Sequence, residues 1–583
     1  MAQTVNEFRG ECLESPCNQW HFTHFTTVSV DIVADDGNAT GQVLTHRDKS
    51  DKDGDVPDKA DTTRCERATP VQEESRMNLW RTKTIEQSIR DTEEPAHQLR
   101  KQLGALDLTV FGVGVVIGTG IFVLTGKAAG VQAGPAVALS FVFAGIACAL
   151  AALCYAEFAS TVPVAGSAYT FSYASLGELT AWIIGWDLIL ELALGASTVA
   201  VGWSTYFADV MKQANITIPA FAYGEGHNLV AAGIVLILTA VICFGIKVSS
   251  RVNLVMVTIK IAVVLFVIVA GLFYIKTANY HPFIPPTGSA PAEGAVSTPS
   301  LLQDLGFAPG SFGITGIFTG AALVFFAFIG FDIVATAAEE TKNPQRDIPI
   351  GILGSLAICT TLYVAVSLVV TGMVKYTDIK INAPLAEAFR SVGKPGFATM
   401  ISVGALIGLT TVMMIMMLGQ SRVFFAMSRD RLLPPVFSKV NQRTGTPVRT
   451  TVTTGVVVAV ISTFVPLSEL AELVNIGTLF VFILVAVGIL VLRHKRPDLK
   501  RPFRCPGVPV VPILAILTSF YLMLNLPAAT WIRFVVWMAI GFAIYFLYGA
   551  KHSRLTTDPN YSREADEAAR DARQKDLLPT PGS

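Results

Sequence analysis

The sequence predicts an all-α polytopic membrane protein with about twelve transmembrane helices. Hydrophobic residues make up 52% of the chain and charged residues only 15%, and the charges are concentrated near the two ends. A helix needs ~20 apolar residues to cross a bilayer, and glycines interrupt the first and the sixth of the apolar runs. The runs lie between polar ends, 1–104 and 552–583, at about 105–129, 135–160, 180–209, 229–246, 253–275, 313–337, 348–374, 396–427, 450–465, 468–492, 508–526 and 529–549.

Three regions follow from this pattern. Residues 1–100 form a polar region that we expect to be largely disordered and cytoplasmic, because a dense mixed-charge stretch such as 46–61 cannot bury enough apolar surface to fold. Met77 begins a stretch typical of a cytoplasmic lead-in, which makes it an alternative start. Residues 101–550 form the membrane domain, and residues 551–583 form a cytoplasmic tail.

The basic residues predict the orientation of the chain. Lys and Arg accumulate in cytoplasmic loops, and the loops 429–449 and 493–504 are strongly basic. The long loop 276–312 holds one basic residue, Lys276, whereas the basic loop 375–395 disagrees with the pattern. The majority places both termini in the cytoplasm of a multi-pass plasma-membrane protein.

The first apolar run carries glycines at positions 112, 114, 118 and 120. Each interior Gly costs a helix ~1 kcal/mol relative to Ala. Backbone leaves the helix at membrane depth only where it is buried in protein or lines a cavity. A broken helix here favours a polar substrate held by main-chain groups. The alternative is close helix packing through the spacing Gly114-xxx-Gly118.

The sixth run has a matching interruption, with Gly330 and Asp332 in its middle third. Interrupted segments in corresponding positions of two halves indicate an inverted-repeat transporter. We therefore expect a 5+5 repeat in which helices 1 and 6 are broken, followed by two additional C-terminal helices.

Charged residues inside the runs are few, and a charge at the centre of a membrane helix is costly enough that it usually serves a function. Lys260 lies a third of the way along the fifth run and is a candidate for taking up and releasing a proton, with snorkelling to the surface as the alternative. Asp187 and Glu191 share one face of the third run. We expect Asp187 to be interfacial, and Glu191 to be a second proton-coupling candidate or a structural hydrogen-bond partner.

Catalytic and metal-binding patterns are missing from the sequence. All eight histidines fall outside the apolar runs, and the eight cysteines follow no metal-ligand spacing. We expect no enzyme activity, metal, cofactor, structural disulfide or nucleic-acid partner. The sequence does not indicate an oligomeric state.

The segments around the two interruptions and the third run resemble those of the amino acid–polyamine–organocation superfamily, in particular the bacterial relatives of the cationic amino acid transporters. The resemblance covers roughly residues 79–550. The matching segments are 112–122, 155–157, 185–191, 326–332 and 339–344.

The resemblance implies an α-amino acid at the membrane midplane. Its carboxylate would meet N–H groups of Gly118, Thr119 and Gly120, where a half-helix begins. Phe326 matches an aromatic residue that closes the outer side of the site. The ammonium would meet carbonyl groups near both breaks, and the full expected binding set is Val116, Ile117, Gly118, Thr119, Gly120, Ile121, Phe326, Ala327, Phe328, Ile329 and Gly330.

The resemblance also bears on coupling. Lys260 matches a helix 5 lysine that takes the place of a sodium ion in proton-coupled relatives. The alternative is a sodium site to which Thr410 and Thr411 in helix 8 would supply hydroxyl groups. The expected function is proton-coupled symport of an α-amino acid by alternating access. The alternatives are exchange without net proton flux and a substrate-sensing receptor without transport. A neutral amino acid fits the apolar wall of the expected binding site slightly better than a cationic one. The sequence leaves both substrate classes possible.

Overall fold

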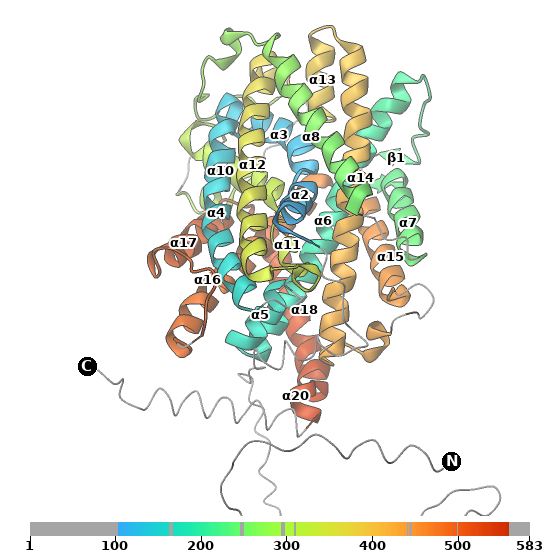
Figure 1. Ribbon diagram of the computed structural model, residues 1–583. Helices are drawn as coiled ribbons and strands as arrows, with labels where there is room; N and C mark the ends of the chain where they lie inside the picture. Colours follow the sequence, from blue (N-terminus) through green and yellow to red (C-terminus); the bar gives the residue numbers. More distant parts are fainter. Residues whose placement is uncertain are drawn as a thin grey trace, which may run out of the picture. The chain divides into compact units, whose positions relative to one another are not determined.

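The computed structural model describes residues 103–558, apart from 163–166, 225, 245–249, 293–297, 308–310, 440, 442–445 and 498. The expected disordered region 1–100, the alternative start at Met77 and most of the tail 551–583 lie outside the described residues. The rest is a helical bundle (Figure 1) with one short hairpin, in which Tyr223 pairs with Asn228.

The first half of the described chain contains the first broken helix, the three long apolar helices α4, α6 and α8, and the shorter apolar helix α7. Its elements are α2 (Ala105–Val116), η1 (Gly120–Leu124), α3 (Thr125–Ala128), η2 (Ala129–Ala133), η3 (Gly134–Ala136), α4 (Val137–Thr161), α5 (Ser167–Ser175), α6 (Glu178–Gln213), β1 (Tyr223–Gly224), β2 (His227–Asn228), α7 (Leu229–Cys243), α8 (Ser250–Leu272) and η4 (Thr277–Tyr280).

The second half begins with the second broken helix. Its elements are α9 (Leu301–Asp304), α10 (Gly313–Val324), η5 (Phe325–Phe328), α11 (Ile333–Thr336), η6 (Ala338–Glu340), α12 (Pro344–Met373), η7 (Tyr376–Asp378), α13 (Pro384–Ser391), α14 (Pro395–Arg429), η8 (Pro435–Ser438), α15 (Val448–Phe464), α16 (Leu467–Lys495), α17 (Val510–Leu524), α18 (Ala528–Ile544), η9 (Tyr545–Gly549), α19 (Ala550–His552) and α20 (Arg554–Thr557).

Each apolar run that the sequence predicts contains a helix. Among the described residues, eight helical segments are long and apolar enough to cross a membrane, and α2, α7, α15 and α17 are shorter apolar helices. Large apolar side chains are exposed on α7, α8, α15, α17 and α18. Exposed apolar surface of this extent marks contact with another apolar phase, which agrees with a bilayer around the bundle.

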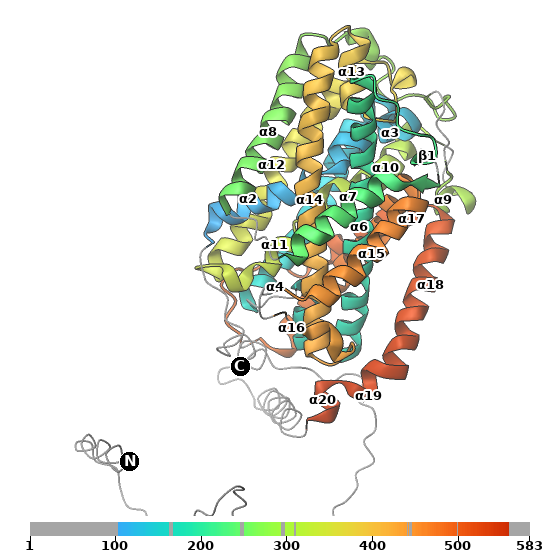
Figure 2. The same cartoon turned by 90° about the vertical axis from the view of Figure 1, so that its right-hand side faces the viewer.

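The long helices pack so that the two broken helices lie inside. The long helix α6 packs against α14 and α16, while α12 contacts both α2 and α4. Figure 2 shows α18 at the margin of the bundle, where the indole nitrogens of Trp182 and Trp186 on α6 donate to the carbonyl oxygens of Gly541 and Trp537. The broken helices are therefore surrounded by protein, as unwound backbone at membrane depth requires.

Candidate site at two broken helices

The first broken helix loses its helical geometry at Ile117. The α2 segment ends at Val116, Ile117 is extended with φ −72° and ψ 93°, and the chain becomes helical again at Gly120. The second segment continues through η1, α3 and η2 to Ala133. Because the first N–H groups of a helix have no partner within it, this start directs main-chain donors into the break.

Thr119 adds a buried hydroxyl to the same break. Its side chain is fully buried, and among the described residues its Oγ1 has no hydrogen-bond partner. Gly202 on α6 leaves room for it, since a Cβ at that position would lie 2.6 Å from Thr119 Cγ2. Buried polar groups are normally paired, so this hydroxyl is available to a bound polar molecule.

The second broken helix changes direction at two residues. After the 3₁₀ turn η5, Ile329 is extended with φ −62° and ψ 136°, and Gly330 has φ +112°. A side chain is strained at this φ, and a Cβ on Gly330 would also lie 3.3 Å from Val115 Cβ. Glycine is therefore required both for the backbone turn and for contact with α2.

The two breaks touch backbone to backbone. A Cβ on Gly120 would lie 2.8 Å from the Ala327 nitrogen and closer still to the Ala327 α-carbon. Gly118 is less restricted, because its Cβ would first meet Val412 Cγ1 at 3.4 Å. The expected binding residues from Val116 to Ile121 and from Phe326 to Gly330 are thus brought together, and the side chains among them are buried.

Tyr363 on α12 links the two breaks and was not identified from the sequence. Its hydroxyl lies 2.6 Å from Val116 O and 2.9 Å from Ala327 O, so one proton is shared between two carbonyl groups. Its ring packs against Phe328 at a centroid distance of 5.3 Å. The only available signal was a tyrosine within an apolar run, whose hydroxyl usually finds a partner when buried.

Lys260 on α8 reaches the first break from the side. The side chain is fully buried, and Nζ donates to Gly114 O at 2.5 Å and Ile117 O at 3.4 Å. Gly408 on α14 makes space for the aliphatic part, since a Cβ there would lie 2.9 Å from Lys260 Cγ. The amine is thus bound by the carbonyl groups that flank the end of α2, and snorkelling is wrong for this residue.

Glu191 lies in a separate cluster of acids. Its carboxylate interacts electrostatically with Asp332 and Asp187. Tyr155 is close to all three acids. Glu191 is therefore placed beside the second broken helix, through Asp332, while the interactions found for Lys260 are with main-chain carbonyl groups and with Cys359.

The expectation of an interfacial Asp187 is wrong. Its side chain is fully buried, and neither of its carboxylate oxygens has a hydrogen-bond partner among the described residues. Asp187 follows Glu178, the first residue of α6, by nine positions, and the reason for its burial is the packing of α16 against α6. A Cβ on Gly477 of α16 would lie 2.8 Å from Asp187 Oδ1, so α16 covers the carboxylate.

The aromatic residues of the second break differ in their surroundings. Phe325 and Phe331 pack against Phe482 on α16, with centroid distances of 5.7 and 5.3 Å. Phe328 packs against Phe141 and Tyr363. Phe326 is 4% exposed and has no ring partner among the described residues. Three of the four rings thus belong to the helix packing.

Thr410 and Thr411, the alternative sodium ligands, have local partners. Thr410 accepts from Trp203 Nε1 at 3.0 Å and donates to Leu406 O, and Thr411 donates to Gly408 O. Gly408, one turn before Thr411, is the α14 residue that faces Lys260.

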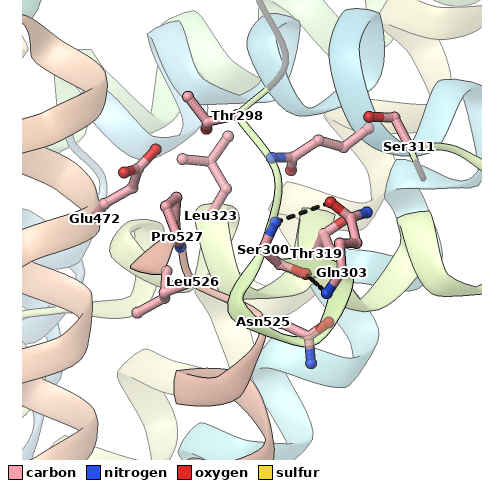
Figure 3. A pocket seen from close by; sticks show the side chains of 11 residues that line it. Thr298, Ser300, Gln303, Ser311, Thr319, Leu323, Glu472, Asn525, Leu526 and Pro527 are labelled. Atoms are coloured by element: carbon pink, nitrogen blue, oxygen red, sulfur yellow. Dashed lines mark hydrogen bonds between the residues drawn. The ribbon is translucent and has the colours of Figure 1, made fainter. Parts of the chain in front are cut away.

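Two cavities lie away from the breaks. One (Figure 3) has a volume of about 10 Å³ and is lined by Ser300, Gln303, Glu472 and their neighbours, with Ser300 and Gln303 hydrogen-bonded to each other. This volume holds a single water molecule. The other, about 180 Å³, lies beside α13 and is lined in part by Lys380 and Arg390. Neither is lined by residues of the breaks.

Two broken helices that meet inside a bundle of membrane-length helices define a membrane transporter. The chain matches the amino acid permease family model over residues 103–556. It therefore belongs to the amino acid permease family of the amino acid–polyamine–organocation superfamily, which confirms the resemblance found in the sequence, and it is a transporter and not an enzyme.

Similar proteins come from bacteria and plants. The chain is 48% identical to the branched-chain amino acid permease BcaP and 46% identical to the methylthioribose transporter, both of Bacillus subtilis (strain 168). Each match covers 82% of this chain and 99% of the relative. It is 32% identical to the vacuolar cationic amino acid transporter 4 of Arabidopsis thaliana, over 82% of this chain and 96% of that protein.

Proposed function

We propose that the protein is a secondary active transporter that carries a neutral α-amino acid together with a proton across the plasma membrane by alternating access. The observation that supports this most strongly is the contact of the two helix breaks at Gly120 and Ala327, with Lys260 bound to the first break. The proposed arrangement is a 5+5 inverted repeat of ten helices beginning at α2 and α10, followed by α17 and α18.

The substrate carboxylate would occupy the start of the helical segment at Gly120, where the N–H groups of Gly118, Thr119 and Gly120 and the positive end of the helix dipole stabilise an anion. The Thr119 hydroxyl supplies a further donor. The ammonium group would bind carbonyl oxygens of Val116, Ala327 and their neighbours. A carbonyl oxygen has two lone pairs, so Val116 and Ala327 can accept from Tyr363 and from the substrate.

A neutral side chain is favoured by the composition of the site. The expected binding residues of both breaks carry apolar side chains or none, apart from Thr119. Asp332, the nearest acid on the second broken helix, interacts with Glu191. The similarity to a branched-chain amino acid permease supports the same class. Methylthioribose is a second candidate substrate because of the nearly equal similarity to its transporter.

Coupling would operate through the contact of Lys260 with the end of α2. A protonated Lys260 donates to the carbonyl groups of Gly114 and Ile117 and stabilises this shape of the break. Loss of the proton weakens these hydrogen bonds and releases the break. A ligand or proton shifts a conformational equilibrium only through its different affinity for the two states, and this contact supplies such a difference. Glu191 is the alternative proton carrier.

The basic loops 429–449 and 493–504 support an orientation with both termini in the cytoplasm. In this orientation the C-terminal ends of α4 and α16 face the cytoplasm. Lys127, and Glu472 near the N-terminal end of α16, face the outside.

Uptake into proteoliposomes that contain the purified full chain tests the proposal. We expect accumulation of radiolabelled leucine when the outside is acidified, competition by valine or alanine, and weak competition by arginine. Uptake of methylthioribose without competition by amino acids would instead favour the second substrate. Leucine movement only when leucine is loaded inside would indicate an exchanger. Binding of leucine without any movement would indicate a sensor.

A further inference from the structure

The end of α4 is attached to the segment between α16 and α17 by one buried carboxylate. Glu157 is fully buried, and its two oxygens accept from Arg493 Nε at 3.0 Å and Arg493 Nη2 at 2.6 Å. Arg501 Nε lies 3.3 Å from Glu157 Oε1, and the Cys505 N–H donates to Glu157 Oε2 at 2.7 Å. These contacts hold Arg501 and Cys505 against α4; the described residues of 496–509, to which both belong, are called the connecting segment below.

Two thiols meet beside this carboxylate. Cys154 precedes Glu157 by three residues and therefore lies on the same face of α4. Its side chain interacts electrostatically with that of Cys505 in the connecting segment, and the Cys505 N–H is bonded to Glu157 Oε2, one helical turn from Cys154. Both cysteines are free, with exposures of 0% and 2%. The Cys505 main chain is held on both sides, because its carbonyl also accepts from Arg493 Nη2 at 3.0 Å.

The surroundings of Cys505 favour its thiolate form, in contrast to those of an ordinary buried thiol. The neighbouring Cys154 thiol and the Arg493 guanidinium lower the pKa of Cys505, against the opposing effects of burial and of Glu157. The thiolate is the reactive form of cysteine, and it is favoured beside Arg. Arg504 and Pro506 are both exposed, so Cys505 lies just beneath the surface of the connecting segment, where a small oxidant can reach it after a local opening.

We infer that Cys154 and Cys505 form a redox-active dithiol that a hydroperoxide converts into a disulfide, joining α4 covalently to the connecting segment. The Cys505 thiolate attacks the hydroperoxide, the O–O bond breaks, and a sulfenic acid forms while the alcohol or water leaves with a proton. Cys154 then attacks the sulfenic sulfur, and water leaves as the S–S bond forms. Two thiols are oxidised, and one hydroperoxide is reduced.

The disulfide would join parts of the bundle that now touch through Glu157. The α4 helix packs against α10 and η5, which lead into the second break, and against α12, which carries Tyr363. The connecting segment follows α16, whose Asn475 Nδ2 donates to Ala322 O and Leu323 O of α10. The chemistry of the dithiol does not depend on the proposed transport function.

The test uses full-length protein in which Cys12, Cys17 and Cys65 are replaced by serine, so that residues outside the described part contribute no thiols. The purified protein is treated with hydrogen peroxide, remaining thiols are alkylated in denaturant, and non-reduced chymotryptic peptides are analysed by mass spectrometry. We expect loss of alkylation at Cys154 and Cys505 together and a peptide pair linked through them, lighter by two hydrogens. Dithiothreitol should restore both thiols.

Controls separate this pair from general oxidation. Cys148 and Cys359 are buried elsewhere and should stay reduced. In Cys154→Ser protein of unchanged melting temperature, Cys505 should oxidise further to the sulfinic acid, because no second thiol can resolve the sulfenic acid. The inference is wrong if peroxide leaves both thiols free, links either cysteine to another partner, or produces sulfinic Cys505 while Cys154 is present.

Discussion

The hydroxyl of Tyr363 lies 2.6 Å from the carbonyl oxygen of Val116, the last residue of α2. The same hydroxyl is 2.9 Å from Ala327 O in the second break. Tyr363 therefore fixes the position of one unwound segment relative to the other. Main-chain groups bind a ligand well only when their positions are fixed in advance, because ordering them on binding costs free energy.

Removing this hydroxyl should weaken substrate binding while the fold persists. A hydrogen bond contributes about 0.5–1.5 kcal/mol net, so Tyr363→Phe should lower leucine affinity by up to about tenfold in a radioligand binding assay on detergent-purified protein. Tyr280→Phe is the matched control, because Tyr280 donates to Leu368 O outside the breaks. Equal affinities of Tyr363→Phe and wild type would show that Tyr363 does not organise the site.

A larger side chain at Gly120 should abolish binding. A Cβ there already overlaps the Ala327 backbone, so Gly120→Leu must push the two breaks apart. We expect loss of leucine binding in protein that still inserts into the membrane and elutes as a single peak. Gly233→Leu on α7 should bind normally, because a Cβ at Gly233 meets nothing within 4 Å. Wild-type affinity in well-folded Gly120→Leu protein would show that the contact between the breaks serves helix packing and not substrate binding.

Phe326→Ala should weaken substrate retention, because an aromatic cover excludes water from the charged ends of the substrate and strengthens their interactions. A loss of about tenfold in affinity corresponds to about 1.4 kcal/mol. The matched control is Phe325→Ala, which removes an equal ring that packs against Phe482. That variant should lower the melting temperature more than Phe326→Ala and change affinity less. The reverse pattern would exclude Phe326 as the gate.

The sequence predicts the features that depend on local backbone chemistry. Glycines at 118, 120 and 330 predict both helix breaks, because a missing side chain is itself the reason that the backbone can leave the helix there. Lys260 is also predictable as a buried functional candidate, since its position in an apolar run is unusual whatever its neighbours.

Features that depend on packing between distant segments are not predictable in this way. Tyr363 meets Val116 across 247 positions of the chain, and no local pattern marks this contact. Asp187 is buried because α16 covers it, which the sequence of α6 does not indicate. The register of α14 was also open, and it is Gly408 that faces Lys260.

The proton-coupling role of Lys260 gives the last prediction. Lys260→Met has a similar volume but cannot donate to Gly114 O or Ile117 O, so the break loses the contact that would respond to protonation. We expect the variant to lose leucine accumulation driven by an inward proton gradient, while exchange between leucine inside and outside persists. Both are measured in proteoliposomes as uptake with and without a pH gradient.

A matched control removes a lysine charge elsewhere. Lys394→Met changes an exposed side chain that lies over the ring of Tyr274, with 5.9 Å from Nζ to the ring centroid, and should accumulate leucine as the wild type does. Accumulation by Lys260→Met against a gradient would assign Lys260 a structural role. In that case Glu191→Gln becomes the deciding variant, because Glu191 interacts electrostatically with Asp332 of the second broken helix and is the alternative proton carrier.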